Sequence, residues 1–518
     1  MTQAHGGFDW PVVYSLNQKR VLEDLKQGRI QYADLSQWSF VDEFLCFILQ
    51  SEFLKFADRT YPNPRKKNEV PIWFLISCQF LLRLNAFGQY HQLGYLMNSG
   101  SLLSRIGFNV SRSGSVGFNH KNHDPRGTAV DPDTVRKFFK DTKPEEIRQW
   151  YGCDIQNWFR TKRTFDSRGI FILDQTHLVV PDNPNYKKAA KLPVDEHGQW
   201  YQGLDLMTEE EKNSLIYHPC YCLTTLLHTQ PGADWFHLAG YEWGAGDEDE
   251  LTQAERFIPR FCENHPNLIK ELIMDRGYVS GLFVGDLKRK YEIDSIMPLK
   301  KSMITYKDAV GIAKRDLSNW KKIEESREQP SGKLLMEQWA YWIEDLDLWD
   351  SCPVPQNALV TKKIEWDSEV QEYLEFYWVL GTTKKYRHPQ VILEHYRLRT
   401  QIEERYRQFK LSWNLAKFPS TDESLMESHL CFILLTYSLL NLYLRQEDLR
   451  QHTHQMIQTL KQEESLGKNV ILVYANDCFG VFNLDDYSLT LVELESSAKV
   501  KIKEALKEQK IQRLNRSL

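Results

Sequence analysis

Over the first 165 residues, apolar side chains recur at helical spacing and are interrupted by turn-rich stretches. The clearest interruptions are YPNPRKKN near residue 61 and the Gly-, Ser- and Asn-rich stretch from 111 to 127. Two segments, HQLGYLMNSGSLLSRIG from 91 and DPDTVRKFFKD from 131, resemble pieces of a helix-turn-helix. Short helices joined by Gly or Pro turns are also typical of any helical bundle, and we favour this packing interpretation. The pattern predicts a helical N-terminal domain, residues 1–165.

After residue 165 the apolar positions form short β-rich runs separated by helical stretches. The runs are GIFILDQTHLVV, YCLTTLLHT, DWFHLAGYEW, LIKELIMD and IDSIMPLKK, and the helical stretches are ERFIPRFCENH and GLFVGDLKRKY. This alternation predicts an α/β fold, with a mixed five-stranded sheet and flanking helices over residues 166–301.

The alternation stops between residues 302 and 387. There, EQWAYWIEDLDLW, NALVTKKIEW and EYLEFYWVLGTT have the pattern of antiparallel strands, which predicts an all-β insertion. Helical spacing returns over residues 388–445, and we expect this segment to complete the α/β unit. The tail, residues 446–518, has mixed character, and dimerisation is the role we consider for it.

Composition narrows the class of protein. A chain of 518 residues is long enough for about two to four domains, and its 42% hydrophobic content allows several buried cores. The net charge of −5 excludes a basic field over the whole protein, so a surface that binds DNA must be local. The nine scattered Cys contain no CxxC pair, which suits a reducing cytosol, and the apolar runs are too short to span a membrane. We expect a cytoplasmic protein with no membrane partner.

Two carboxylates lie where buried strands are predicted to end. Asp174 follows the apolar run FIL, and Asp275 follows the apolar run LIM. Open sheets bind ligands at strand ends, which makes the pair a candidate site. Either residue alone is more often an Asp that caps a turn, because its side chain hydrogen-bonds neighbouring backbone N–H groups.

The segment YRLRTQIEERYRQFK places polar side chains on one side of a predicted helix. At about 100° per residue, one narrow face carries Tyr396, Arg399, Glu403 and Lys410. Glu404 lies away from this face. The same spacing would suit a solvated face with an i,i+4 pair between Arg399 and Glu403, and spacing alone does not decide between the two interpretations.

Positive charge is concentrated around the same segment. Between residues 384 and 417 there are nine Lys or Arg and three Glu, which predicts a local basic patch suited to phosphate. Lys300 ends the run SIMPLK at the same predicted sheet edge, where phosphate contact and ordinary solvation are equally good interpretations. The HPCYC segment invites a zinc interpretation, but it lacks a fourth ligand, and we favour a buried strand with small thiols.

The spacing Tyr, two residues, Arg, three residues, Glu, six residues, Lys resembles the signature of DDE transposases of the insertion-sequence IS-four group. The segments LDQT and IMDRGY are similar to the first and second aspartate motifs of that family. The β-rich insertion between Asp275 and Glu403 resembles the one that its members carry, and the likeness spans roughly residues 165–445. It implies a ribonuclease-H-like catalytic core with a β-strand insertion and a helical N-terminal region that binds DNA.

The resemblance also implies roles for individual residues. Asp174, Asp275 and Glu403 would be the catalytic carboxylates and the ligands of two Mg²⁺ ions, for which Mn²⁺ can substitute. The residues that it leads us to expect at the DNA are Tyr396, Arg399, Lys410, Trp378, Arg407 and Lys300. For Trp378, stacking on a flipped base competes with a core role, since Leu374, Phe376, Trp378 and Leu380 alternate onto one strand face.

The implied activity is that of a DNA transposase, which cuts the ends of a mobile element and joins them to target DNA by phosphodiester hydrolysis and transesterification. Its partners would be double-stranded DNA, at the terminal inverted repeats and at the target, and a second copy of the chain in a homodimer. It would act in the bacterial cytosol, at the nucleoid. Two alternatives remain: a catalytically inactive, transposase-derived DNA-binding regulator, and a metal-dependent nuclease of the same fold.

Overall fold

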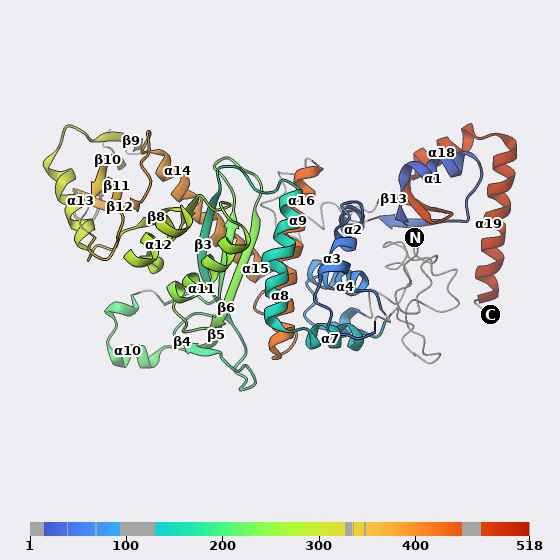
Figure 1. Ribbon diagram of the computed structural model, residues 1–518, viewed down its shortest axis with the longest axis horizontal. Coiled ribbons are helices and arrows are strands. Elements are labelled where there is room, and N and C mark those ends of the chain that lie inside the picture. Colours follow the sequence, from blue (N-terminus) through green and yellow to red (C-terminus); the bar gives the residue numbers. More distant parts are fainter. Residues whose placement is uncertain are drawn as a thin grey trace. The chain divides into compact units, whose positions relative to one another are not determined.

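A computed structural model describes residues 15–38, 40–67, 70–93, 130–201, 203–326, 334, 336–346, 349–447 and 468–516. The chain divides into two compact units, and Figure 1 labels most of their elements. One unit is Tyr151–Lys410, and the other combines Met1–Trp150 with Leu411–Leu518. Most of the segment HQLGYLMNSGSLLSRIG and all of the stretch from 111 to 127 lie outside the described residues.

The unit Tyr151–Lys410 is built on a ten-stranded sheet. Its first part has the strand order β6-β5-β3-β7-β8, in which β3 pairs antiparallel with β5 and parallel with β7. The strands are β3 (Ile170–Val179), β5 (His218–His228), β6 (His237–Ala245), β7 (Glu271–Ile273) and β8 (Asp294–Pro298). This is the predicted mixed five-stranded sheet, with the first strand in the middle, as in the ribonuclease-H-like fold.

Between β3 and β5 lies a long connection with β4 (Ala190–Leu192) and α10 (Glu209–Ser214), and β4 pairs antiparallel with His218–Cys220 at the start of β5. Ahead of β3, the unit begins with a π-helical turn (Tyr151–Ile155), which continues into α9 (Gln156–Thr161). The helices α11 (Glu250–Asn264) and α12 (Gly281–Tyr291) follow β6 and β7 in the chain.

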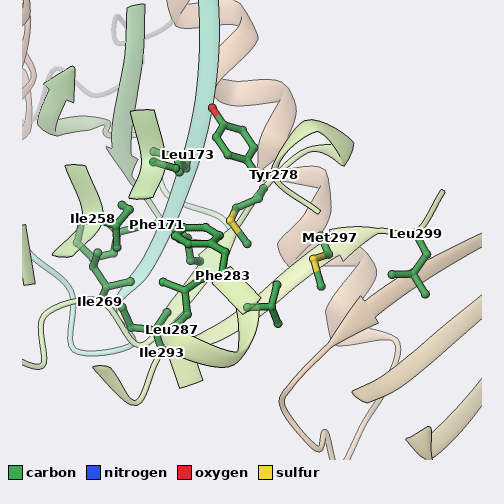
Figure 2. Packing of buried hydrophobic residues seen from close by; sticks show 14 of the residues in the cluster. Phe171, Leu173, Ile258, Ile269, Tyr278, Phe283, Leu287, Ile293, Met297 and Leu299 are labelled. Carbon is green, nitrogen blue, oxygen red and sulfur yellow. The ribbon is translucent and has the colours of Figure 1, made fainter. Parts of the chain in front are cut away.

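One hydrophobic cluster joins the sheet to α11 and α12. Figure 2 shows Phe171 and Leu173 of β3 beside Ile258 of α11 and Phe283 and Leu287 of α12. These side chains are at most 5% exposed. Each large apolar side chain buried in this way contributes about 1.5–3 kcal/mol to folding, so the cluster holds β3 and β7 firmly.

The insertion forms four antiparallel strands in the order β12-β11-β10-β9. They are β9 (Lys321–Ser326), β10 (Met336–Leu346), β11 (Gln356–Asp367) and β12 (Glu372–Thr382). Residues Leu380 to Thr382 of β12 pair antiparallel with β8, so the insertion continues the core sheet instead of forming a separate one.

The prediction of an all-β insertion missed α13 (Ile304–Arg315), which precedes β9. Tyr306, Ala309 and Ala313 recur three and four residues apart and are buried in the same cluster as Val360 and Val379. This apolar stripe explains the helix, because it covers one face of the insertion's strands.

The predicted long helix after the insertion is divided into α14 (Val391–Arg397) and α15 (Arg399–Ser412). At the junction, the N–H of Leu398 donates to the carbonyl of His395, and the N–H of Gln401 donates to the carbonyl of Leu398. These are three-residue bonds, tighter than those of an α-helix. Tyr396 therefore lies on α14 and the other three signature residues on α15.

In the other unit, helices pack around α16 (Glu423–Gln446), which is buried along nearly its whole length. They are α2 (Phe40–Gln50), α3 (Phe53–Thr60), α4 (Ile72–Leu84), α7 (Pro132–Asp141) and α8 (Pro144–Trp150). Phe432 of α16 contacts the rings of Tyr61, Phe139 and Trp150. Among the described residues, α16 alone is long and apolar enough to cross a membrane, so the expectation that every apolar run is too short is wrong for this segment. Its apolar window is entirely buried in this core, as in the core helix of many folded proteins.

The second helix-turn-helix candidate, DPDTVRKFFKD, forms α7. Asp131 caps its N-terminus, accepting a hydrogen bond from the N–H of Asp133. Val135, Phe138 and Phe139 are buried, and the Tyr61 and Phe138 rings stack. Packing thus accounts for the apolar positions of this helix, as the favoured interpretation predicted.

A four-stranded sheet joins the two ends of the described chain, in the order β1-β14-β13-β2. It combines β1 (Ser15–Leu16) and β2 (Tyr32–Trp38) with β13 (Lys468–Ala475) and β14 (Cys478–Asn483). The helices beside it are α1 (Gln18–Lys26), α18 (Leu484–Glu493) and α19 (Ser496–Arg516). Neither this sheet nor the association of the two segments follows from the local sequence pattern. The domain boundaries predicted from the sequence stay a prediction.

Candidate active site

Sheet pairing brings Asp174 and Asp275 to the same edge. β3 and β7 are parallel neighbours in the sheet, with Ile172 opposite Ile273. Asp174 lies two residues after Ile172, and Asp275 lies two residues after Ile273. Asp275 lies just beyond β7, and its carboxylate accepts a hydrogen bond from the N–H of Arg276 at 2.7 Å. The two carboxylates therefore lie together as predicted, but the strand-end prediction is wrong for Asp174, because β3 continues to Val179 and pairs with β5 beyond this residue.

A single guanidinium contacts all three predicted carboxylates. Arg399 Nη2 lies 2.7 Å from Glu403 Oε1, one helical turn away on α15. Its Nη1 lies 3.4 Å from Asp275 Oδ2 and 3.9 Å from Asp174 Oδ2. The i,i+4 pair is thus real, but it also reaches across to the sheet edge, which a purely solvated face would not do.

The side chain of Glu404 points elsewhere. Its carboxylate binds the Arg407 guanidinium through two contacts of 2.7 Å and accepts a third hydrogen bond from Gln408. The helical-wheel argument that separated Glu403 from Glu404 agrees with these contacts.

The sequence analysis did not identify Tyr406, which ties α15 to the sheet at the site. Its hydroxyl lies 2.5 Å from the backbone carbonyl of Asp174, to which it donates, and 2.8 Å from the Thr225 hydroxyl. Tyr406 is three residues after Glu403 and is buried, so it fixes the rotation of the helix that carries Glu403. A Tyr on the buried side of a signature helix is the only sequence signal, and it is a weak one.

The site carries more negative than positive charge. Burial raises the pKa of Asp174 to about 7; the charges of Asp275 and Glu403 act in the same direction, and Arg399 opposes them. Carboxylate oxygens are the ligands that hard divalent cations prefer, so the donor set fits Mg²⁺ or Mn²⁺. Within the part of the chain that the structure describes, no three acidic, His or Cys side chains already converge as a metal cage. Arg399 instead lies among the carboxylates.

A fourth carboxylate, Glu250, also escaped the sequence analysis. It is the first residue of α11, and burial raises its pKa to about 7, with the Asp275 charge adding to the effect. Its side chain fills the space over Gly277: a Cβ there would lie 1.1 Å from Glu250 Oε1. Any larger side chain two residues after Asp275 would have to displace the Glu250 carboxylate, which covers the turn that carries Asp275. Lys300 is exposed, and its charge partly offsets the shift at Glu250.

Trp378 lies beside the signature segment. Its ring meets that of Tyr396 edge to face, with centroids 5.2 Å apart. The core of the insertion uses the other face of β12, where Tyr377 and Val379 join the hydrophobic cluster, and Phe376 on the Trp378 face is 50% exposed. The interpretation of Leu374, Phe376, Trp378 and Leu380 as the insertion's core is therefore wrong for the outer part of this strand. Burial raises the pKa of Tyr396 to about 12, so its hydroxyl stays protonated.

Lys410 contacts neither the carboxylates nor Arg399 directly. Its amine donates to the backbone carbonyl of His197 at 2.6 Å, and burial lowers its pKa to about 8. His197 belongs to a hairpin in the β3–β5 connection that packs on β3, where Gly198 at φ +76° leaves no room for a Cβ against the carbonyl of His177.

Much of the predicted basic patch is neutralised within the protein. The internal pairs are Lys384 with Glu271, Lys385 with Asp345, Arg399 with the three carboxylates, and Arg407 with Glu404. Arg405 is fully buried, with its guanidinium carbon 4.0 Å from the centre of the Phe236 ring. Counting cations along the sequence overestimated this patch, because counting does not register partners that are distant in sequence.

A second polar cluster surrounds Glu271, the first residue of β7, which is 1% exposed. Its carboxylate accepts a hydrogen bond from Tyr386 Oη at 2.6 Å, pairs with Lys384 Nζ at 3.0 Å and binds His395 Nδ1. Burial alone would raise the pKa of Glu271, but these partners hold it below its ordinary value. The cluster fastens the end of the insertion and the start of α14 to the catalytic sheet.

The thiols of HPCYC have partners other than a metal. Cys220 Sγ contacts the carbonyl of Ala190, and Cys222 Sγ contacts the carbonyl of Ala245 at 2.7 Å. Both thiols lie on the buried strand β5, which supports the interpretation as a structural strand.

Comparison with known families adds an independent finding. A family model with the description "Transposase DDE domain" matches residues 166–439, more than half of the chain. The matched segment contains Asp174, Asp275 and Glu403. No curated protein matches the chain.

Proposed function

Since the chain belongs to the family of transposases with a DDE domain, we propose that it cuts the ends of a mobile DNA element and joins them to target DNA. The observation that carries this proposal is the approach of Asp174, Asp275 and Glu403 to one guanidinium, within 3.9 Å. Residues from a strand, a strand end and a helix converge there although they are far apart in the sequence.

The proposed reaction has two steps at one site. Water attacks a phosphodiester at the element's end and releases a 3′-hydroxyl, and that hydroxyl then attacks a phosphodiester of the target, with the target's 3′ oxygen leaving. Asp174, Asp275 and Glu403 would hold divalent cations, which this family uses and which activate the attacking oxygen and stabilise the leaving oxygen when bound. We propose two Mg²⁺ ions, with Mn²⁺ as a substitute.

The chain's own residues supply orientation. The parallel pairing of β3 and β7 fixes the two Asp, and the Tyr406 hydroxyl anchors α15 so that Glu403 faces them. Arg399 offers several N–H donors to phosphate oxygens once the carboxylates bind cations, a role that suits its planar fork. The protonated hydroxyl of Tyr396 would donate to a phosphate oxygen.

Around this centre we propose DNA contacts by Trp378, Lys300, Arg407 and Lys410. Trp378 is half-buried on the side of β12 that the core does not use, so its ring could stack on a base extruded from the duplex. Lys410 would have to exchange the His197 carbonyl for a phosphate oxygen, which would raise the pKa of its amine from about 8.

The wider assembly follows from the reaction. Two element ends must be held together, so we propose a homodimer on double-stranded DNA that acts in the bacterial cytosol. We propose that the helical N-terminal region contributes to recognition of the terminal inverted repeats.

The test uses purified full-length protein, Mg²⁺ or Mn²⁺, and a plasmid that carries the gene with its native flanks. We expect cuts at defined ends and new insertions with wild type, and neither product with Asp275→Asn. Cuts without insertions would identify a nuclease instead. DNA binding without cuts under either metal would contradict the catalytic proposal and favour a regulator.

A further inference from the structure

The C-terminal helix α19 carries a regular row of cations in the unit that does not contain the carboxylates. Lys499, Lys503 and Lys507 lie four residues apart. At about 100° per residue these three positions fall within about 80° of one another around the helix axis. We call this face the α19 basic row.

Packing fixes the direction in which the α19 basic row faces. Ala498 and Ile502 are buried in the small cluster of the terminal sheet, and Ala505 and Leu506 pack against it. The helix therefore cannot rotate freely about its axis. The acidic residues Glu504 and Glu508 lie outside the row, about 60° and 100° from Lys507 around the helix axis.

The charges of the row are not balanced within the described residues. Lys499 Nζ donates to the carbonyl of Val492 at 2.9 Å, at the end of α18. Lys503 and Lys507 are exposed, and neither has an ion pair or hydrogen bond with another described side chain. Like charges four residues apart destabilise a helix, so a row of this kind is unfavourable in the free protein unless a partner compensates it. In the predicted basic patch, in contrast, four of the nine cations form ion pairs, namely Lys384, Lys385, Arg399 and Arg407.

We infer that the α19 basic row binds the phosphate backbone of duplex DNA, as a contact surface separate from the candidate active site. From Lys499 to Lys507 the row extends about 12 Å at 1.5 Å per residue, long enough to reach several phosphates of a duplex, which carries one charge per about 1.7 Å of its axis. Among anionic partners the occupant is DNA, because the proposed function already brings duplex DNA to the protein. A second copy of the same face would be repelled by its charge.

The double variant Lys503→Gln/Lys507→Gln tests the inference in the full chain. The control, Lys321→Gln/Lys501→Gln, removes the same charge from exposed positions outside the row, one of them on α19 itself. Binding to a non-cognate 30-base-pair duplex is measured by fluorescence anisotropy over a series of salt concentrations. Each lost phosphate contact should reduce the steepness of log affinity against log salt by about 0.9, so the row variant should reduce it by about 1.8. Its binding near 0.15 M salt should weaken roughly tenfold or more. The control should stay near wild type in both respects.

A second measurement does not depend on any variant. Lysine acetylation of the wild-type protein, followed by mass spectrometry, should show that the duplex protects Lys503 and Lys507 and leaves Lys501 reactive. Equal slopes for the two double variants, or equal reactivity of these lysines with and without DNA, would overturn the inference. The inference would also be overturned if the row variant lost binding to phosphatidylserine vesicles and kept wild-type DNA binding, because the row would then be a lipid-binding surface.

The choice of DNA as the ligand rests on the proposed function. Cleavage assays test the two proposals separately. At low salt and saturating protein, the row variant should cut DNA at the wild-type rate. A wild-type protein that binds DNA through the row but never cuts it would contradict the proposed function and support the α19 inference. A wild-type protein that cuts DNA, together with a row variant whose salt slope is unchanged, would support the proposed function and contradict the α19 inference.

Discussion

Strand β7 has a carboxylate near each end, and the two are in opposite electrostatic situations. At its start, the single carboxylate of Glu271 is hydrogen-bonded by Tyr386, Lys384 and His395. These partners hold the pKa of Glu271 below its ordinary value. Beyond its end, Asp275 shares one guanidinium with two other carboxylates.

The comparison separates a structural cluster from a functional one. Donors outnumber acceptor groups around Glu271, so the buried charge is compensated and the cluster can fasten α14 and the insertion to the sheet. Carboxylates outnumber cations around Asp275, and burial raises the pKa of the neighbouring Asp174 to about 7. Such a site is under-compensated in the free protein and favours added positive charge, as a metal-dependent site requires. The same short strand thus links a rigid anchor to a reactive centre.

The largest effect should come from removing a carboxylate at the reactive end. Asp275→Asn should lower the rate of DNA strand cleavage by at least about 1,000-fold, since loss of metal-assisted stabilisation removes several kcal/mol from the transition state. Initial rates on a labelled element-end duplex in Mg²⁺ give the number. Asp286→Asn, at an exposed helix position paired with Lys290, is the control and should cut normally. A residual rate within tenfold of wild type would remove Asp275 from the catalytic set.

At the anchored end the expected loss is of stability. Glu271→Gln leaves His395 and Lys384 without their carboxylate partner, and breaking a buried charged pair destabilises a protein by about 3–5 kcal/mol. Urea unfolding, followed by tryptophan fluorescence, measures the change. Tyr386→Phe removes one neutral donor from the same carboxylate and should lose only about 1 kcal/mol. If both variants have the same free energy of unfolding as wild type, the cluster does not anchor the fold.

Asp174→Asn should change stability in the opposite direction, by an amount that depends on pH. The Asp174 carboxyl holds its proton up to about pH 7 in the folded metal-free protein, whereas its ordinary pKa is 3.8. Between these values the folded state binds more protons, so wild-type stability falls as pH rises. The variant lacks this penalty and should melt a few degrees above wild type at pH 8, with the gap closing toward pH 4. A variant that melts below wild type at pH 8 in EDTA would contradict this account.

The smallest expected effect concerns Trp378, which lies beside the reactive end without belonging to the carboxylate cluster. Stacking of a base on an aromatic ring is worth about 1–3 kcal/mol, so Trp378→Ala should slow the steps after the first nick by about 5- to 100-fold, and Trp378→Phe should retain most of the rate. Time courses on pre-nicked and intact duplexes separate these steps. Equal slowing by Ala and Phe would argue against stacking.

Part of this picture could be predicted from the sequence. Apolar runs that end in Asp predicted that Asp174 and Asp275 lie together, although the strand of Asp174 continues to Val179 instead of ending there. Helical spacing separated Glu403 from Glu404. Both signals are local, since they depend on residues within one element. The five strands of the core were predicted for the same reason.

What the sequence did not show depends on contacts between distant residues. Glu271 lies 124 residues from His395, and the Tyr406 hydroxyl reaches a carbonyl 232 residues away. No spacing rule predicts such pairs, and the basic patch was overestimated because its partners lie far along the chain. The pairing of β2 with β13 is of the same kind, because a strand's pattern does not name its neighbour.

The measurement that tests the central claim most directly compares two adjacent residues on α15. Glu403→Gln and Glu404→Gln make the same chemical change at neighbouring positions, one in contact with Arg399 and the other with Arg407. Strand cleavage in Mg²⁺ is measured for both variants, with DNA affinity and melting temperature as controls. We predict that Glu403→Gln binds DNA and abolishes cleavage, whereas Glu404→Gln cuts within about tenfold of wild type. Equal cleavage by the two variants, or loss of activity only in Glu404→Gln, would contradict the assignment of the three carboxylates as the catalytic centre.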